Sequence, residues 1–192
     1  MNQFEETLFR GLNGLSGHST LLDEVMFRLS DSQTWNFAVL AFYVYVYSTK
    51  NRELTKTFWC AMIALAASDV ISFEIIKPLV GRERPCWLLS GVNLYAGKCG
   101  GSYGFTSNHA ANGFAVWAAI VKVNGRRSWL AMSALSLATL VSFSRVYLGV
   151  HFVGDVVGGA ILGVLVTTIL WTQGLYSWST WIIDKSGPKG LL

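Results

Sequence analysis

The sequence predicts an all-α fold, a polytopic membrane bundle of about five transmembrane helices preceded by amphipathic helices. Three observations support this prediction. Hydrophobic residues make up 52% of the 192-residue chain, and charged residues make up only 14%, whereas about a quarter of the residues in a soluble domain are charged. The mean hydropathy is +0.42. The apolar residues gather in runs of roughly 20, the length that crosses a bilayer as a helix.

The first segment of the chain, residues 1–31, mixes acidic side chains with apolar ones at i, i+3, i+4 spacing. This pattern indicates one or two amphipathic helices lying on the membrane surface, with a re-entrant segment as the alternative. No basic region precedes an apolar core at the start of the chain, so we expect no cleaved signal peptide.

The central segment, residues 32–171, contains the expected transmembrane helices. Neither an internal repeat nor a long linker divides it, so we expect residues 1–192 to form one membrane-embedded domain. The tail, residues 172–192, is short and contains Trp, as interfacial segments often do. The expected spans are residues 32–48, 57–80, 107–123, 128–147 and 151–171.

Basic residues are concentrated on one of the two sides that five spans create. The positive-inside rule places this side, with the tail 172–192, in the cytoplasm and the other side in the periplasm or exterior. We therefore expect an inner-membrane or plasma-membrane protein, and the net charge of +4 requires no nucleic-acid partner. The cytoplasmic side has Lys50, Arg52, Lys56, Lys122, Arg126, Arg127, Lys185 and Lys189, and the other has Arg10, Arg28, Arg82 and Lys98.

The longest loop, residues 81–106, contains Cys86 and Cys99. If this loop lies outside the cytoplasm, a disulfide between these residues is chemically permitted, and free thiols are the alternative. The third cysteine, Cys60, lies within an expected span and is expected to be a packing residue.

Six ionisable side chains lie at the ends of expected spans on a single side of the membrane. Such groups are costly at membrane depth and usually face the bundle interior or a water-filled cavity. A single Lys or Arg at such a place commonly extends to the lipid headgroups instead. Six on one side predict a shared pocket, formed by Lys77, Arg84, His109, Arg145, His151 and Asp155.

The spacing of His151 and Asp155 is i, i+4, which places both on one face of a helix. The carboxylate can then hold one imidazole nitrogen and leave the other as a nucleophile or base. The three cations suit phosphate oxygens, and His109 can protonate a leaving oxygen. Phosphoryl transfer on histidine is predicted. A zinc site at the two histidines and the aspartate is the alternative, but we expect no metal or other cofactor, because no carboxylate cluster suits Mg²⁺.

Three sequence motifs carry a resemblance to a known family. "KPLVGRERP" at residues 77–85 fits K-x6-R-P, and "SRVYLGVHFVGD" at residues 144–155 fits S-R-x5-H-x3-D. With "TSNH" at residues 106–109, these motifs resemble the three-part signature of the type 2 phosphatidic acid phosphatase family. Its members are integral-membrane relatives of vanadium haloperoxidases.

The resemblance implies a role for each matching residue. His151 attacks phosphorus and forms a phosphohistidine, with Asp155 as its orienting partner. His109 protonates the leaving group and then activates water. Lys77, Arg84 and Arg145 hold the phosphoryl oxygens together with Ser107, and the family uses no metal.

The middle motif departs from the family pattern P-S-G-H. Thr106 replaces Pro and Asn108 replaces Gly. Asn tolerates a positive φ, so we expect its amide to join Ser107 in binding phosphate. Thr106 is expected to cap the following helix. These expectations keep the site active, and a catalytically inactive relative is the alternative.

Two further features of the spans are expected to be structural. Asp69 is expected to bond to a neighbouring helix. Gly154, Gly158, Gly159 and Gly163 give the last span a face of small residues for close helix packing.

These observations together predict a membrane lipid phosphatase with its active site on the external face. For a bacterial protein, the family resemblance implies lipid A 1-phosphate, undecaprenyl diphosphate or phosphatidylglycerophosphate as the substrate. A lipid phosphotransferase, a non-catalytic transporter or binding protein for anionic lipids, and a structural membrane protein are the alternatives. The sequence does not indicate an oligomeric state.

Overall fold

The computed structural model describes residues 3–97 and 99–186, and within these ranges the fold is helical, with a single isolated β-bridge. The predicted all-α class is therefore confirmed. Lys98 and Lys189, which entered the prediction of orientation, lie outside the described residues, and the side chain of Lys185 is not described either.

The segment before residue 32 forms two helices, α1 (Gln3–Asn13) and α2 (Thr20–Ser30). Phe9 of α1 is fully buried. Its ring lies 5.3 Å from that of Phe152, at the start of a later helix. Asn13 donates to the Tyr147 carbonyl oxygen at 2.8 Å. The amphipathic helix α1 is therefore docked on the bundle, and its contact with a membrane surface remains a prediction.

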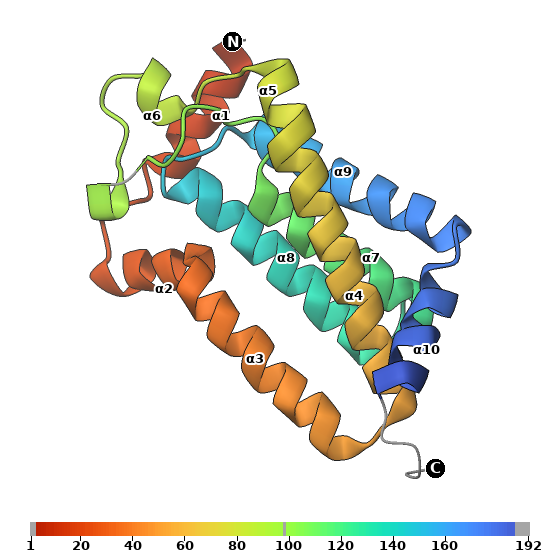
Figure 1. Cartoon of the computed structure of the whole chain (residues 1–192). Helices are drawn as coiled ribbons and strands as arrows, with labels where there is room; N and C mark the ends of the chain where they lie inside the picture. The colour runs from red at the N-terminus through yellow and green to blue at the C-terminus, as the bar shows by residue number, and fades with distance from the viewer. Residues whose placement is uncertain (1–2, 98, 187–192) are drawn as a thin grey trace.

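The remaining helices follow the expected spans closely (Figure 1). The helix expected at residues 57–80 begins five residues earlier, because Asn51 caps it by accepting from the Leu54 N–H at 3.0 Å. This helix continues through a π-helical turn, η1, into α5 without a break. The bounds are α3 (Ser32–Thr49), α4 (Arg52–Val70), η1 (Ile71–Ile76), α5 (Lys77–Val80), α7 (Asn108–Asn124), α8 (Trp129–Tyr147), α9 (Val153–Thr172) and α10 (Leu175–Ser186).

Three helices in the described part of the chain are long and apolar enough to cross a membrane: Arg52–Val80, Trp129–Tyr147 and Val153–Thr172. α7 has 17 residues, and α3 has Tyr, Asn and Gln among its apolar residues. Five spans therefore remain a prediction, although five corresponding helices are present.

Close packing between α7 and α9 forms the centre of the bundle. A Cβ atom on Gly159 would lie 2.5 Å from the Ser107 carbonyl oxygen, and one on Gly163 would overlap the Ala111 carbonyl oxygen. Only glycine allows the two backbones to approach this closely, as the small-residue face predicts. Because α9 is held against α7, the start of α9 is fixed beside Ser107, whose N–H donates to the Asp155 carbonyl oxygen at 3.0 Å.

The long loop after α5 folds back over one end of the bundle. Cys86, in the short helix α6 (Pro85–Leu88), is disulfide-bonded to Cys99, with their Cα atoms 6.0 Å apart. The loop contains a 3-10 turn, η2 (Tyr95–Gly97). Its two arms pair, since the Gly104 N–H donates to the Arg82 carbonyl oxygen at 2.6 Å. This pairing brings the residues after α5 beside those that precede α7.

Candidate active site

All six predicted ionisable residues lie at one end of the bundle, where α5 and α8 end and α7 and α9 begin (Figure 1). His151 lies close enough to Lys77, Arg84, Arg145 and His109 to interact with each electrostatically. The structure therefore brings together the groups that the sequence predicted to share a pocket.

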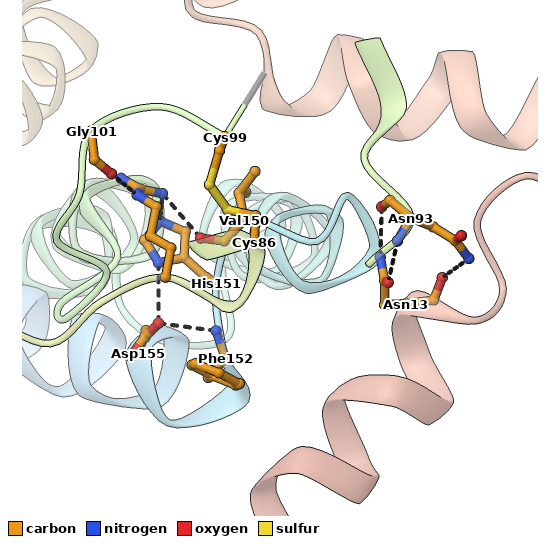
Figure 2. Close-up of a disulfide and its surroundings, with 10 residues drawn as sticks. Asn13, Cys86, Asn93, Cys99, Gly101, Val150, His151, Phe152 and Asp155 are labelled. Carbon is orange, nitrogen blue, oxygen red and sulfur yellow. Dashed lines mark hydrogen bonds and ion pairs between the residues drawn. A yellow bond between two sulfur atoms is a disulfide. The ribbon is translucent and has the colours of Figure 1, made fainter. Parts of the chain in front are cut away.

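His151 is 1% exposed and is held at both ring nitrogens. Its Nδ1 lies 3.4 Å from Asp155 Oδ2, and its Nε2 lies 2.9 Å from Arg84 Nη1 (Figure 2). A guanidinium can only donate, so Nε2 accepts and Nδ1 carries the proton that faces the carboxylate. This assignment, made from the hydrogen-bond partners, leaves the Nε2 lone pair as the nucleophilic position.

The expected helical pairing of His151 and Asp155 is wrong in its geometry, because α9 begins at Val153 and His151 precedes it. Asp155 lies in the first turn of α9, and its Oδ2 reaches back to accept from the Phe152 N–H at 2.9 Å. A carboxylate in the first turn commonly binds the N–H before the helix in this way. The same oxygen faces His151, so the pair forms across a helix start rather than along a helix.

The second oxygen of Asp155 binds a residue that the sequence prediction missed. Arg82 Nη1 lies 3.0 Å from Asp155 Oδ1, and Arg82 Nη2 lies 2.7 Å from Glu5 Oε2. From the sequence, Arg82 was considered only as a positive charge on one side of the membrane. Its position in the first motif, two residues before Arg84, is the sequence feature that could have indicated a place in the site.

Arg84 is buried and holds together the segments around His151. Its Nε donates to the Gly101 carbonyl oxygen at 2.6 Å and its Nη1 to the Val150 carbonyl oxygen at 3.0 Å. Burial lowers the pKa of the Arg84 guanidinium, and the charge of Asp155 opposes this shift. A Cβ on Gly104 would lie 2.9 Å from Asp155 Oδ2 and 3.4 Å from Arg84 Cγ, so this loop position requires glycine.

Lys77 and Ser107 lie where the loop enters α7. The Lys77 ammonium donates to the carbonyl oxygens of Thr106 at 2.6 Å and Gly104 at 3.3 Å. It therefore orders the loop that leads to Ser107. The Ser107 hydroxyl is fully buried and has no hydrogen-bond partner in the described part of the chain. A buried hydroxyl without a partner is costly, and an anion at this helix start would provide one.

His109 and Arg145 share a partner, Ser30, at the end of α2. His109 Nε2 lies 3.0 Å from the Ser30 carbonyl oxygen. Arg145 Nη1 donates to the same oxygen at 3.3 Å and to the Ser30 hydroxyl. A carbonyl can only accept, so His109 Nε2 carries a proton. Arg145 Nε is buried without a partner among the described residues. After the Ser107 hydroxyl, it is the second buried donor of the site that an anion could satisfy.

The side chains of Asn108 and Thr106 face α4 and η1 rather than a phosphate position. Asn108 Nδ2 donates to Asp69 Oδ1 at 2.9 Å, and Asn108 Oδ1 accepts from the Ser72 hydroxyl at 3.0 Å. Thr106 Oγ1 lies 2.8 Å from Ser72 Oγ. Thr106 was expected to cap α7, but the cap position is Ser107 and has no side-chain cap bond. Asn108 retains its backbone N–H for an anion, since the first N–H groups of a helix lack partners within the helix.

The arrangement can bind an anion and act on it. Two donors without partners, three cations and the start of α7 lie around a neutral imidazole whose Nε2 lone pair accepts from Arg84. Among the described residues, no group of three His, Cys, Asp or Glu side chains is placed to hold a metal ion. The described side chains therefore offer hydrogen-bond donors and cations to an anion, beside an imidazole that could act on it.

Comparison with known proteins gives consistent matches. The family model of the PAP2 superfamily matches residues 57–179. A lipid A 4'-phosphatase of Porphyromonas gingivalis is 29% identical over 186 residues, which cover 94% of this chain and 77% of that protein. Phosphatidylglycerophosphatase B of Bacillus subtilis is 41% identical over 112 residues, 54% of this chain and 52% of that protein. The crystal structure of Aquifex aeolicus LpxE superposes with a TM-score of 0.68 at 21% identity, covering 88% of this chain and 94% of that one.

Proposed function

The chain belongs to the PAP2 superfamily and is a membrane lipid phosphatase of that family, and we propose that it hydrolyses a lipid phosphate through a phosphohistidine on His151. The observation that carries this proposal is the state of His151. Its Nδ1 proton faces a buried carboxylate and its Nε2 lone pair faces a cation. An imidazole held in this tautomer is ready for nucleophilic attack at Nε2.

The first step forms a bond from His151 Nε2 to phosphorus and breaks the bond from phosphorus to the lipid oxygen. In the structure, Arg84 Nη1 contacts Nε2. The attack therefore requires the guanidinium to move from the lone pair to the incoming phosphoryl oxygens. His109, in its protonated form, gives its proton to the leaving oxygen. The imidazole becomes positively charged, and Asp155 stabilises that charge through the Nδ1 proton.

The second step restores the enzyme. His109 takes a proton from water, the resulting hydroxide attacks phosphorus, and the bond to His151 Nε2 breaks to release inorganic phosphate. Lys77, Arg84 and Arg145 stabilise the charge on the phosphoryl oxygens in both steps. The Ser107 hydroxyl and the N–H groups at the start of α7 add hydrogen bonds to those oxygens.

For the substrate we propose first a phosphate ester of lipid A, because the relative that matches 94% of the chain is a lipid A 4'-phosphatase. Undecaprenyl diphosphate and phosphatidylglycerophosphate are the other candidates. With five spans and the positive-inside orientation, the site would face the periplasm or exterior. The lipid tail would then remain in the outer leaflet while its phosphate enters the pocket.

The test is phosphate release in detergent from lipid A 1-phosphate, lipid A 4'-phosphate, undecaprenyl diphosphate and phosphatidylglycerophosphate. We expect phosphate release that is insensitive to EDTA and absent in His151→Ala. Release should be retained in His18→Ala, because His18 is exposed in the connection between α1 and α2. Acid-labile phosphate on the wild-type protein, trapped by rapid quenching, supports the intermediate. Release that persists in His151→Ala refutes it, and transfer to a second lipid without phosphate release indicates a phosphotransferase.

A further inference from the structure

Arg82 and Glu5 form an ion-pair chain that ends at Asp155. We propose that Arg82, held in place by Glu5 of the N-terminal helix α1, is a positioning residue for the Asp155–His151 pair. The proposal rests on the function proposed above, and it makes α1 part of the catalytic machinery rather than only a membrane-surface helix.

The contacts of the chain close a ring around the start of α9. Arg82 Nη1 lies 3.0 Å from Asp155 Oδ1, and Arg82 Nη2 lies 2.7 Å from Glu5 Oε2. The other oxygen of Glu5 accepts from the Gly154 N–H at 3.2 Å. The side chains of Arg82 and Glu5 are 24% and 20% exposed, whereas that of Asp155 is 0% exposed. The ion pairs thus connect the partly exposed Glu5 and Arg82 side chains to the fully buried carboxylate of Asp155.

Arg82 is fixed by more than its ion pairs. Its guanidinium lies over the ring of Phe152, 4.6 Å from the centroid, and Phe152 packs on Phe9 of α1. Its carbonyl oxygen accepts from the Gly104 N–H at 2.6 Å. A backbone hydrogen bond, the face of the Phe152 ring and two carboxylates therefore hold Arg82 in place.

Arg82 determines which oxygen of Asp155 faces His151. Oδ2 is shared between His151 Nδ1 and the Phe152 N–H. Oδ1 is buried and has no hydrogen bond among the described residues, and the Arg82 guanidinium, 3.0 Å away, compensates its charge as an ion pair. Without Arg82, Oδ1 would lose that compensation. An uncompensated buried carboxylate is strongly unfavourable, and the side chain would rotate or become neutral. Either change removes the acceptor that keeps the proton on Nδ1 and stabilises the imidazolium.

Glu5 completes the balance of charge. Arg82 alone would cancel the negative charge of Asp155, and the carboxylate would then stabilise a positive imidazole less. With Glu5 present, the three side chains carry a net charge of −1. Glu5 therefore fixes Arg82 and keeps the net charge beside His151 negative, and a negative charge stabilises the imidazole when phosphorus binds it.

The proposal predicts how turnover and substrate affinity separate. Both terminal nitrogens of the Arg82 guanidinium contact carboxylates, so we expect Arg82 to affect turnover rather than substrate binding. We expect Arg82→Gln to lower kcat by about 100-fold with KM unchanged, Arg82→Lys to restore part of the loss, and Glu5→Gln to lower kcat by about tenfold. Because Glu5 acts through Arg82, Glu5→Gln/Arg82→Gln should be no slower than Arg82→Gln alone.

The matched control is Arg10→Gln. Arg10 also pairs with a glutamate of α1, Glu6, at 2.8 Å, but on the exposed surface. We expect its kcat and KM to equal those of the wild type. The elution profile and thermal stability in detergent are measured for every variant, so that loss of fold is separated from loss of positioning.

Several outcomes would overturn the proposal. They are an Arg82→Gln variant with wild-type kcat, a rise in KM with kcat unchanged, or losses in the two single variants that multiply in the double variant. The wild type and His151→Ala are assayed in the same series. If the wild type releases no phosphate from any lipid, the proposed function fails, whereas wild-type activity with unchanged Arg82→Gln refutes only this inference.

Discussion

The two sides of the site, the proposed nucleophile side around His151 and the proposed acid side around His109, are built differently. His151 is 1% exposed and both its ring nitrogens have side-chain partners. His109 is only partly buried, and its contact is a backbone carbonyl oxygen at the end of α2. The side around His151 is therefore held by side-chain contacts, with Arg84 on Nε2, whereas the side around His109 is closed by the end of α2.

This difference fits the roles proposed above for the two histidines. The nucleophile needs a fixed lone pair and a fixed counter-charge, and it meets a small phosphoryl group. The acid must reach the oxygen of a bulky lipid and then allow water to enter. A rigid network suits the first task, and a displaceable contact through Ser30 suits the second. Substitutions on the nucleophile side should therefore cost far more activity than those on the acid side.

The largest effect is expected for Asp155→Asn. The amide of Asn can present an N–H to His151, which favours the tautomer with its proton on Nε2. Loss of the orienting carboxylate from a catalytic histidine lowers turnover by about 10⁴-fold. The measurement is kcat for phosphate release with thermal stability in parallel. Glu53→Gln is the control, since Glu53 pairs with Lys56 at the opposite end of the bundle, and comparable losses in both variants would contradict a role specific to this position.

A smaller but still large loss is expected for Gly104→Ala. The added Cβ would lie 2.9 Å from Asp155 Oδ2 and 3.4 Å from Arg84 Cγ. A displacement of about 1 Å in a catalytic group costs on the order of 100-fold in rate. Gly101→Ala in the same loop is a matched control, because a Cβ there meets nothing within 4 Å. Equal kcat values for the two variants would show that the nucleophile side tolerates displacement.

The sequence predicts the nucleophile side better than the acid side. The six ionisable residues were found because motif spacing and span ends mark them. The contacts of Glu5 and Ser30 were not predicted, because they depend on where two amphipathic helices dock, and an amphipathic pattern specifies a buried face but not its partner. Asn108 was assigned to phosphate from its chemistry alone, and its amide faces Asp69 and Ser72 instead.

The helix bounds were predicted within a few residues because apolar runs and capping residues are local signals. The start of α9 was the consequential exception. An i, i+4 spacing suggested one helix through His151 and Asp155, but the N–H of Phe152 is capped by the Asp155 carboxylate, and His151 lies before the first turn. The spacing predicted the contact between the two side chains, but it did not predict that the pair forms across the start of a helix; the chemistry of the pair stays a prediction.

A modest effect is expected for Ser30→Ala on the acid side. The change removes the hydroxyl that contacts Arg145 and keeps the carbonyl that contacts His109. A single hydrogen bond contributes about 0.5–1.5 kcal/mol, which corresponds to roughly 3- to 10-fold in kcat or KM. Steady-state kinetics with the preferred lipid measure both. A loss as large as that of Gly104→Ala would mean that the two sides are equally rigid, contrary to the comparison.

The smallest effect is expected for Asp23→Asn, which removes a carboxylate that connects α2 to α8. The variant should change how thermal stability depends on pH. Asp23 Oδ1 accepts from the Tyr147 hydroxyl at 2.6 Å and from the Gly17 N–H at 3.0 Å. The Tyr147 hydrogen bond, followed by that of Gly17, lowers the pKa of Asp23 below its ordinary value. A carboxylate with a lowered pKa in the folded state stabilises the fold above its unfolded pKa, and this contribution is lost as the pH falls through the folded value.

Comparison of the wild type with Asp23→Asn isolates this contribution. The wild type should be the more stable at neutral pH, and the difference in melting temperature should shrink as the pH falls below the ordinary pKa of aspartate. Glu24→Gln is the control on the same helix, where the carboxylate forms an exposed pair with Arg28. A difference that stays constant down to acid pH would show that Asp23 contributes by packing alone. A pH-dependent contact between α2 and α8 is consistent with the comparison, because α2 closes the side around His109 and is not part of the network around His151.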